Sequence, residues 1–202
     1  MEERMEAIGN LVNQYSPDII FFQLSKLRVE NFMSKPFLKS SMGREICAAE
    51  IDVGSNKTLV VATSHLESLP PNSEKRVFQA KEALRFLEQF PNVIFGGDMN
   101  WDEYTDDDFP LGGDWTDAWA KLKGEPGWTY DTKSNTMLKG NRPLQKRLDR
   151  FICKLEDFRM MNVEMIGNEA IPDLSYRKNQ KMVLPVFPSD HYGLILTISS
   201  NV

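Results

Sequence analysis

TLVVATSHLES, residues 58–68, and NVIFGGDMN, residues 92–100, are the two stretches that decide the fold. Each begins with a short apolar run of the kind found in buried strands and ends in polar residues. Between them apolar residues recur at helical spacing, at Val77, Ala80, Leu84 and Leu87. A strand, a helix and a second strand within about 40 residues predict a crossover unit, which implies neighbouring strands in a mixed sheet.

The sequence before this unit predicts a helix and a hairpin. Apolar residues at helical spacing favour an amphipathic helix over roughly residues 2–15, followed by a short apolar strand at 18–23. Residues 45–53 alternate, and their apolar face consists of Cys47, Ala49, Ile51 and Val53. The sequence GSNK at 54–57 is typical of a hairpin turn into the strand at 58–65.

The sequence after Asp98 predicts an ordered loop with a short helix up to about Gly127. Strands are expected again at about 147–153 and 191–198. A length of 202 residues suits one domain, and we expect residues 1–202 to form a single one.

The composition is that of an ordinary soluble globular protein, with 41% hydrophobic and 26% charged residues. No apolar run approaches the length of a membrane span, and the charged start MEERMEAIGN argues against a secretory signal peptide. Cys47 and Cys153 are too few for a disulfide framework. We therefore expect two reduced, buried cysteines in an intracellular protein.

Residues 18–32, DIIFFQLSKLRVENF, do not fit this pattern. They contain no Gly, no Pro and no turn dipeptide, so they predict one strand of fifteen residues, beyond the usual range of about 3–10. Two adjacent strands would need a hairpin turn or a crossover between them. We therefore expect a segment to be missing near Gln23-Leu24.

Three polar signatures lie at strand ends, where sites are commonly built. The chain has two histidines, His65 in TSHLES and His191 in PSDHYG. In GGDMN two glycines let the backbone turn sharply, and Asp98 and Asn100 can face one cleft because they are two residues apart. Structural roles are the alternative, since lone histidines are often structural and Asp and Asn favour turns and helix caps.

Asp149, in QKRLDRF, is expected mid-strand, where a carboxylate is costly unless it is paired. Its partner is either a neighbouring Arg or a histidine whose tautomer it fixes, as in hydrolytic triads. Together with Asp98, Asn100 and the pair Asp190-His191, it supplies the groups that phosphodiester hydrolysis needs. No Walker loop, His-Glu-x-x-His motif or Cys cluster suggests another class.

A basic stretch lies close to these motifs although the net charge of the chain is −5. It contains Lys139, Arg142, Lys146, Arg147 and Arg150. The stretch either serves a negative ligand or is a solvated surface loop that runs into a strand.

SHLES, GGDMN, GWTYD, QKRLD and PSDHYG occur in this order in the endonuclease/exonuclease/phosphatase superfamily, which the chain resembles from about Tyr15 to Ile198. SHLES, GWTYD and PSDHYG are most similar to the 5′-tyrosyl-DNA phosphodiesterases, plant versions included. The resemblance implies a DNase I-like four-layer α/β sandwich, in which two mixed sheets are flanked by helices. It also implies hydrolysis of 5′-phosphotyrosyl bonds in DNA repair, with Mg²⁺ as cofactor and Mn²⁺ as the alternative.

The resemblance assigns a role to each motif residue. Asp98 would orient the attacking water and Asn100 would bind the scissile phosphate. His65 and Ser68 would hold phosphate oxygens.

In the second half of the chain, Asp190 would be a Mg²⁺ ligand. His191 would stabilise the transition state, with Asp149 hydrogen-bonded behind it. Trp128 would press against the DNA end, and the basic stretch, Arg147 included, would contact DNA phosphates without reading sequence.

The chain departs from the resemblance in its N-terminal part, where we expect the sandwich to be incomplete. The family opens with a strand that carries a functional Asn, and this chain starts after it. The metal-ligating Glu of the family follows Phe-Gln, where this sequence has Leu24. We therefore expect an internal deletion at 23–24 and impaired activity, because Mg²⁺ relies on a few carboxylates.

Two other functions stay open: a catalytically inactive DNA- or protein-binding module of the same fold, and a phosphatase or phosphodiesterase for lipid or inositol phosphates. The resemblance implies a nuclear protein, with the cytoplasm as the alternative. Its partners would be DNA ends with 5′-linked tyrosine or phosphate and no membrane, and we expect a monomer.

Overall fold

The computed structural model describes residues 1–20, 24–25, 29–179 and 182–201. The chain divides into two compact units. Unit 1 comprises Met1–Pro17, Gly127–Arg147 and Glu164–Ile195, and unit 2 comprises Asp18–Pro126, Leu148–Val163 and Leu196–Val202. That residues 1–202 form a single domain stays a prediction.

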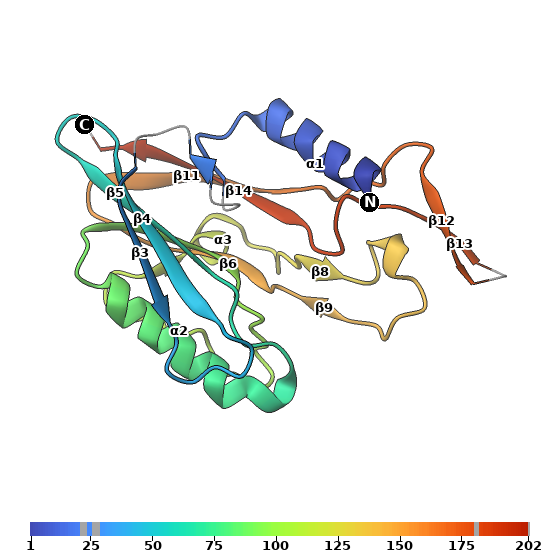
Figure 1. The fold of residues 1–202 in the computed structure, drawn as a ribbon, viewed down its shortest axis with the longest axis horizontal. Coiled ribbons are helices and arrows are strands. Elements are labelled where there is room, and N and C mark those ends of the chain that lie inside the picture. Colours follow the sequence, from blue (N-terminus) through green and yellow to red (C-terminus); the bar gives the residue numbers. More distant parts are fainter. Residues whose placement is uncertain (21–23, 26–28, 180–181, 202) are drawn as a thin grey trace. The chain divides into compact units, whose positions relative to one another are not determined.

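Unit 2 is built on a six-stranded mixed sheet with the strand order β3-β4-β5-β6-β10-β7. Of these strands, β3, β4, β5 and β6 are labelled in Figure 1. Its strands are β3 (Val29–Pro36), β4 (Glu45–Asp52), β5 (Thr58–Ser64), β6 (Asn92–Asp98), β7 (Thr116–Asp117) and β10 (Asp149–Leu155). β5 and β6 are parallel and are connected by the helix α2 (Ser73–Leu87), whereas the other neighbours are antiparallel. The predicted crossover unit is therefore confirmed.

The predicted hairpin between β4 and β5 is also confirmed. The amide of Val53 donates to the carbonyl of Lys57 at 3.1 Å, and the amide of Lys57 donates to the carbonyl of Gly54 at 3.0 Å. Ser55 and Asn56 have φ angles of 55° and 56°. Two consecutive positive φ angles define a type I′ turn, whose twist matches that of the paired strands.

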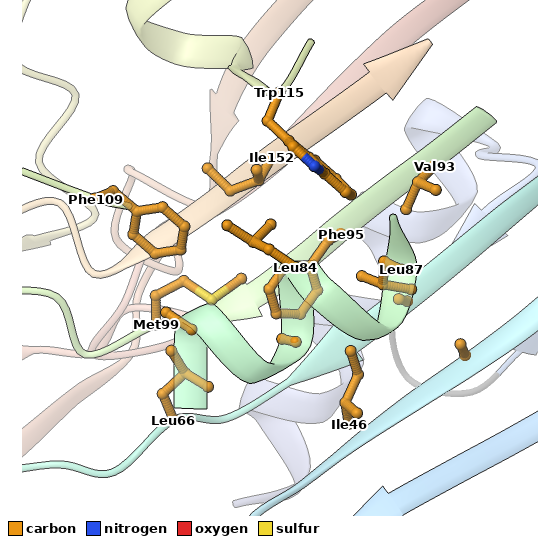
Figure 2. Close-up of a cluster of buried hydrophobic side chains, with 14 of the residues drawn as sticks. Ile46, Leu66, Leu84, Leu87, Val93, Phe95, Met99, Phe109, Trp115 and Ile152 are labelled. Atoms are coloured by element: carbon orange, nitrogen blue, oxygen red, sulfur yellow. The ribbon is translucent and has the colours of Figure 1, made fainter. Parts of the chain in front are cut away.

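Two hydrophobic clusters cover the opposite faces of this sheet. In the first, Phe95 of β6 and Ile152 of β10 meet Leu84 and Leu87 of α2 (Figure 2). The second is formed by alternate residues of the same strands, among them Ile51 of β4. It also includes partly buried side chains from β11 and β14, which are Met160, Leu196 and Ile198. Each fully buried Leu or Phe contributes about 1.5–3 kcal/mol, so the sheet is stabilised from both sides.

The remaining elements of unit 2 are short. They are β1 (Ile19–Ile20), β2 (Leu24–Ser25), the 3-10 helix η1 (Pro70–Asn72) and the helix α3 (Ala118–Leu122). β1 and β2 pair antiparallel. The predicted strand at 18–23 is therefore longer than β1, and residues 18–32 do not form one strand. Gln23, beside which we expect a deletion, lies outside the described residues.

Unit 1 contains the predicted N-terminal helix, α1 (Glu2–Tyr15), which ends at Ser16 in the left-handed conformation. Its other elements are β8 (Tyr130–Asp131), η2 (Thr136–Leu138), β9 (Gln145–Lys146), β12 (Ser175–Asn179) and β13 (Met182–Pro185). A third cluster, of Met137, Val186, Phe187 and Tyr192, forms its core.

Two long strands, β11 (Phe158–Ile166) and β14 (Gly193–Ser200), pair with each other and run partly in each unit. β10 and β14 correspond to the strands predicted at about 147–153 and 191–198. Within the described part of the chain, no helix is long and apolar enough to cross a membrane.

Candidate active site

His65 and Asp98 lie side by side at one edge of the unit 2 sheet. Both follow directly from the fold, because β5 ends at Ser64 and its parallel neighbour β6 ends at Asp98. The Nε2 atom of His65 is 3.3 Å from the Oδ2 atom of Asp98. The His65 side chain is 51% exposed and the Asp98 side chain only 20%, so the imidazole is open to a ligand while the carboxylate is sheltered.

Gly97 makes this approach possible. Its φ angle is +145°, and a Cβ atom at this position would overlap the carbonyl oxygen of Ser64. Only glycine fits such a position. The amide of Leu66 donates to the carbonyl of Asp98 at 3.0 Å, which joins the two strand ends.

Asn100 fixes the orientation of the Asp98 carboxylate. Its amide donates to Oδ1 of Asp98 at 2.8 Å, and its side-chain Nδ2 donates to the carbonyl of Leu66 at 3.1 Å. Asn100 has a φ angle of 47°, a conformation that Asn tolerates better than most residues. The alternative reading of GGDMN as a turn is thus correct in geometry, and the turn leaves Oδ2 of Asp98 directed at His65.

Asp149 stands opposite Asp98 on the neighbouring strand. The two are cross-strand partners, and oxygen atoms of their carboxylates lie within 4.8 Å of each other. The prediction that Asp149 lies mid-strand is wrong, because β10 begins with it. Just before this strand, the carbonyl of Leu148 accepts a hydrogen bond from the amide of Met99 at 2.8 Å.

Ser68 belongs to the same loop as His65. Its hydroxyl donates to Sδ of Met42 at 3.3 Å, and its side chain is half-buried. The ends of two adjacent parallel strands, with the loops that follow them, thus supply His65, Ser68, Asp98 and Asn100.

The motifs GWTYD and PSDHYG lie against each other in unit 1. The amide of Tyr192 donates to the carbonyl of Thr129 at 2.7 Å. The rings of Tyr130 and His191 meet edge to face with their centroids 5.3 Å apart. Asp190, beside His191, is exposed.

The Tyr192 hydroxyl is linked through the exposed Ser134 to the buried carboxylate of Asp131. The Ser134 hydroxyl lies 2.9 Å from the Tyr192 hydroxyl and donates to Oδ2 of Asp131 at 2.8 Å. Burial raises the pKa of the Tyr192 phenol, and the nearby Asp131 carboxylate adds to this effect. The phenol therefore stays protonated, and it anchors the segment that carries His191 and Asp190.

The basic stretch is divided between the units. Arg150 is buried and forms ion pairs of 3.0 Å with both Asp117 and Glu103, so its assignment to a phosphate-binding stretch is wrong. A guanidinium at the start of a core-facing strand needs carboxylate partners, which are supplied by Glu103 in the loop after Asp98 and by Asp117 in β7. Arg147 is half-buried in unit 1, where Trp128 is 38% exposed.

Comparison with known proteins gives a consistent picture. No family model matches the chain. Tyrosyl-DNA phosphodiesterase 2 of Rattus norvegicus is 30% identical over 243 residues, which include 98% of this chain and 63% of the rat protein. The Mus musculus protein of the same name is 28% identical, with 98% and 62% covered. The chain is similar to these phosphodiesterases over almost all of its own length. It spans about three-fifths of the length of the relatives that it matches.

Solved structures show the same fold. TDP2 from D. rerio, complexed with single strand DNA product, superimposes with a TM-score of 0.81 at 21% identity and covers 98% of this chain and 92% of that one. An endonuclease/exonuclease/phosphatase family protein from Bacteroides thetaiotaomicron has a TM-score of 0.57 at 15% identity, covering 86% and 65%. The fold is therefore the α/β fold of this superfamily, with mixed sheets.

The matched region also bears on the expected deletion. It is 243 residues long, whereas this whole chain has 202, so the relatives carry residues within that region that this chain lacks. The position of the deletion at 23–24 stays a prediction.

The fold family is one of divalent-metal-dependent enzymes, and the donor set of unit 2 fits such an ion. Asp98 and Asp149 offer carboxylate oxygens within 4.8 Å of each other. Two carboxylates this close repel each other, and hard cations such as Mg²⁺ prefer oxygen ligands. These two residues could therefore hold a divalent cation.

One residue of the site is missing from the sequence predictions. Glu67, the Glu of SHLES, is fully buried between His65 and Ser68. The sequence contained no signal for its burial, because the donors that make a buried carboxylate tolerable lie in a distant turn at 40–42.

Proposed function

We propose that this protein is a divalent-metal-dependent phosphodiesterase that hydrolyses 5′-phosphotyrosyl bonds at DNA ends, in an impaired form. The observation that carries the proposal is the gathering of His65, Asp98, Asn100 and Asp149 at one edge of the unit 2 sheet. The names of the homologues support the substrate class.

The unit 2 residues divide the chemistry between them. Asp98 orients the attacking water, because its carboxylate is fixed by the Asn100 amide and sheltered from solvent. His65 and Ser68 bind phosphate oxygens, with Asn100 on the scissile phosphate. A bound Mg²⁺ or Mn²⁺ would neutralise charge on the phosphate and acidify the water.

Further roles are proposed for residues of unit 1. His191 stabilises the transition state, with Asp149 as its hydrogen-bond partner, and Asp190 is a metal ligand. The ring of Tyr130 restricts the orientation of His191, and the exposure of Asp190 suits a metal ligand. Trp128 stacks on the DNA end, and Arg147 binds a DNA phosphate.

The test is turnover of a 5′-phosphotyrosyl oligonucleotide with Mg²⁺. Asp98→Asn should reduce turnover by about 10²–10⁴-fold, the range for a lost proton-transfer or water-orienting group. Asp114→Asn is the matched control, because it removes an exposed carboxylate elsewhere in unit 2. Turnover by Asp98→Asn at the parental rate would refute the proposal.

A catalytically inactive binding module is the second candidate, and the residues missing from the matched region favour it. It predicts no turnover by the parent protein but retained DNA binding that weakens steeply with salt. Cleavage of a lipid or inositol phosphate in place of the oligonucleotide would instead indicate the third candidate.

The cellular setting follows from the proposed substrate. A protein that acts on DNA ends is expected in the nucleus. We separately propose that the protein is a monomer. Fluorescence microscopy of the tagged chain tests the first expectation and light scattering the second.

A further inference from the structure

Glu67 is a fully buried carboxylate in the loop that carries the proposed phosphate ligands. The two proposed phosphate ligands near it in the sequence are more accessible than Glu67, since His65 is exposed and Ser68 is half-buried. A buried ionised carboxylate is costly unless donors surround it. The contacts of Glu67 therefore show what it is for.

Within the described residues, the three donors to the Glu67 carboxylate come from one short turn, and all of them bond to the same oxygen. Its Oε1 atom accepts hydrogen bonds from the Ser40 hydroxyl at 2.8 Å, from the Ser41 amide and from the Met42 amide at 3.0 Å. Burial alone would raise the pKa of Glu67, but these hydrogen bonds outweigh burial and lower it. The carboxylate stays ionised and ties the turn at 40–42 to the loop at 65–68.

The helix α2 holds the backbone on both sides of this contact. The Gln79 side chain accepts from the Glu67 amide at 2.9 Å and donates to the carbonyl of Lys39 at 2.8 Å. Arg76 donates to the carbonyl of Glu67 at 2.8 Å. Arg76 itself is fixed by two 2.7 Å bonds to the buried carboxylate of Asp106.

The turn at 40–42 reaches the proposed site through Met42. Its Sδ atom accepts from the hydroxyl of Ser68 at 3.3 Å, so the turn that Glu67 holds in turn orients Ser68. Ser68 directly follows Glu67 in the sequence, and His65 precedes Glu67 by two positions.

We propose that Glu67 is a positioning residue that orients Ser68 through the turn at 40–42 and orients His65 by fixing the loop at 65–68 to which both belong. The catalytic part of this inference rests on the proposed function, but the positional part does not. Loss of the hydrogen bonds between Glu67 and the turn at 40–42 releases the loop at 65–68, while the side chains of His65 and Asp98 stay unchanged.

The first experiment reads the position of His65 directly. The chain has only two histidines, so the ring signals of His65 and His191 are assigned in a heteronuclear NMR spectrum from one His→Ala variant. Glu67→Gln and Ser40→Ala should shift and broaden the His65 signals and leave those of His191 in place. Glu74→Gln is the control, because Glu74 is an exposed carboxylate on α2.

His65 signals that coincide with the parental ones in both Glu67→Gln and Ser40→Ala would overturn the proposal. Ser40→Ala leaves the carboxylate two amide donors and does not change its charge, so it decides the matter if circular dichroism shows that Glu67→Gln is unfolded. A shift in both variants supports positioning, because the charge effect of Glu67→Gln is absent from Ser40→Ala.

The second experiment is kinetic. With the phosphotyrosyl oligonucleotide, Glu67→Gln should lower kcat/KM by about 10–100-fold, the usual cost of losing an outer-shell partner, and most of the change should be in KM. An unchanged KM in a folded variant would count against the proposal. If the parent protein has no turnover, the proposed function fails, whereas the NMR result still decides the role of Glu67.

Discussion

Replacing Gly97 by alanine tests how β5 and β6 bring His65 and Asp98 together. Alanine at a φ angle of +145° costs about 1–3 kcal/mol of backbone strain. Its Cβ atom would also overlap the carbonyl oxygen of Ser64, and relieving such an overlap in a packed region costs about 1–3 kcal/mol more. We therefore expect Gly97→Ala to lower the free energy of unfolding by about 3 kcal/mol.

Urea denaturation followed by circular dichroism measures this loss. With a slope of about 2 kcal/mol per molar urea, the midpoint should fall by about 1.5 M. Gly112→Ala is the matched control, since a Cβ atom there meets nothing within 4 Å, and it should change stability by less than about 0.5 kcal/mol. A Gly97→Ala midpoint equal to that of Gly112→Ala would refute the close approach of the two strand ends.

Three further predictions concern buried groups. Arg76→Met leaves the Asp106 carboxylate buried without its ion pair and should cost about 3–5 kcal/mol in a urea titration; a cost below 1 kcal/mol would contradict the buried pair. Hydrogen bonds outweigh burial and lower the pKa of Glu67 and of Asp106 below their ordinary values of 4.5 and 3.8, so the unfolded chain binds more protons than the folded one in acid. Stability should therefore be at its full value above about pH 5 and fall as the pH drops through the folded-state pKa values, and a urea midpoint constant from pH 6 to pH 3 would show otherwise. Burial raises the pKa of Cys153 to about 12, so iodoacetamide at pH 8 should label the half-buried Cys47 first, which peptide mass spectrometry would detect; equal labelling of the folded protein would argue against a buried Cys153.

The sequence predicted the elements whose signals are local. The helix α1, the β4–β5 hairpin and the β5–α2–β6 crossover depend on periodicity and turn residues that lie within each segment. The edge at which His65 and Asp98 meet follows from the crossover alone.

What the sequence did not predict depends on partners that are distant along the chain. Arg150 looked like part of a basic surface stretch, but its carboxylate partner Asp117 is 33 positions away. Glu67 looked like an ordinary motif residue because Ser40, which donates to it, lies 27 positions earlier. Cys47 was expected to be buried with its alternating neighbours and is half-buried.

The parallel pairing of β5 and β6 places His65 beside Asp98 through a short connection in the sequence. The segment from Thr58 to Asp98 builds the imidazole–carboxylate pair from a continuous piece of polypeptide, closed by one helix. The pairing of His65 with Asp98 therefore depends on local connectivity, whereas Asp149, the cross-strand partner of Asp98, is supplied by a segment about 50 positions further along the chain.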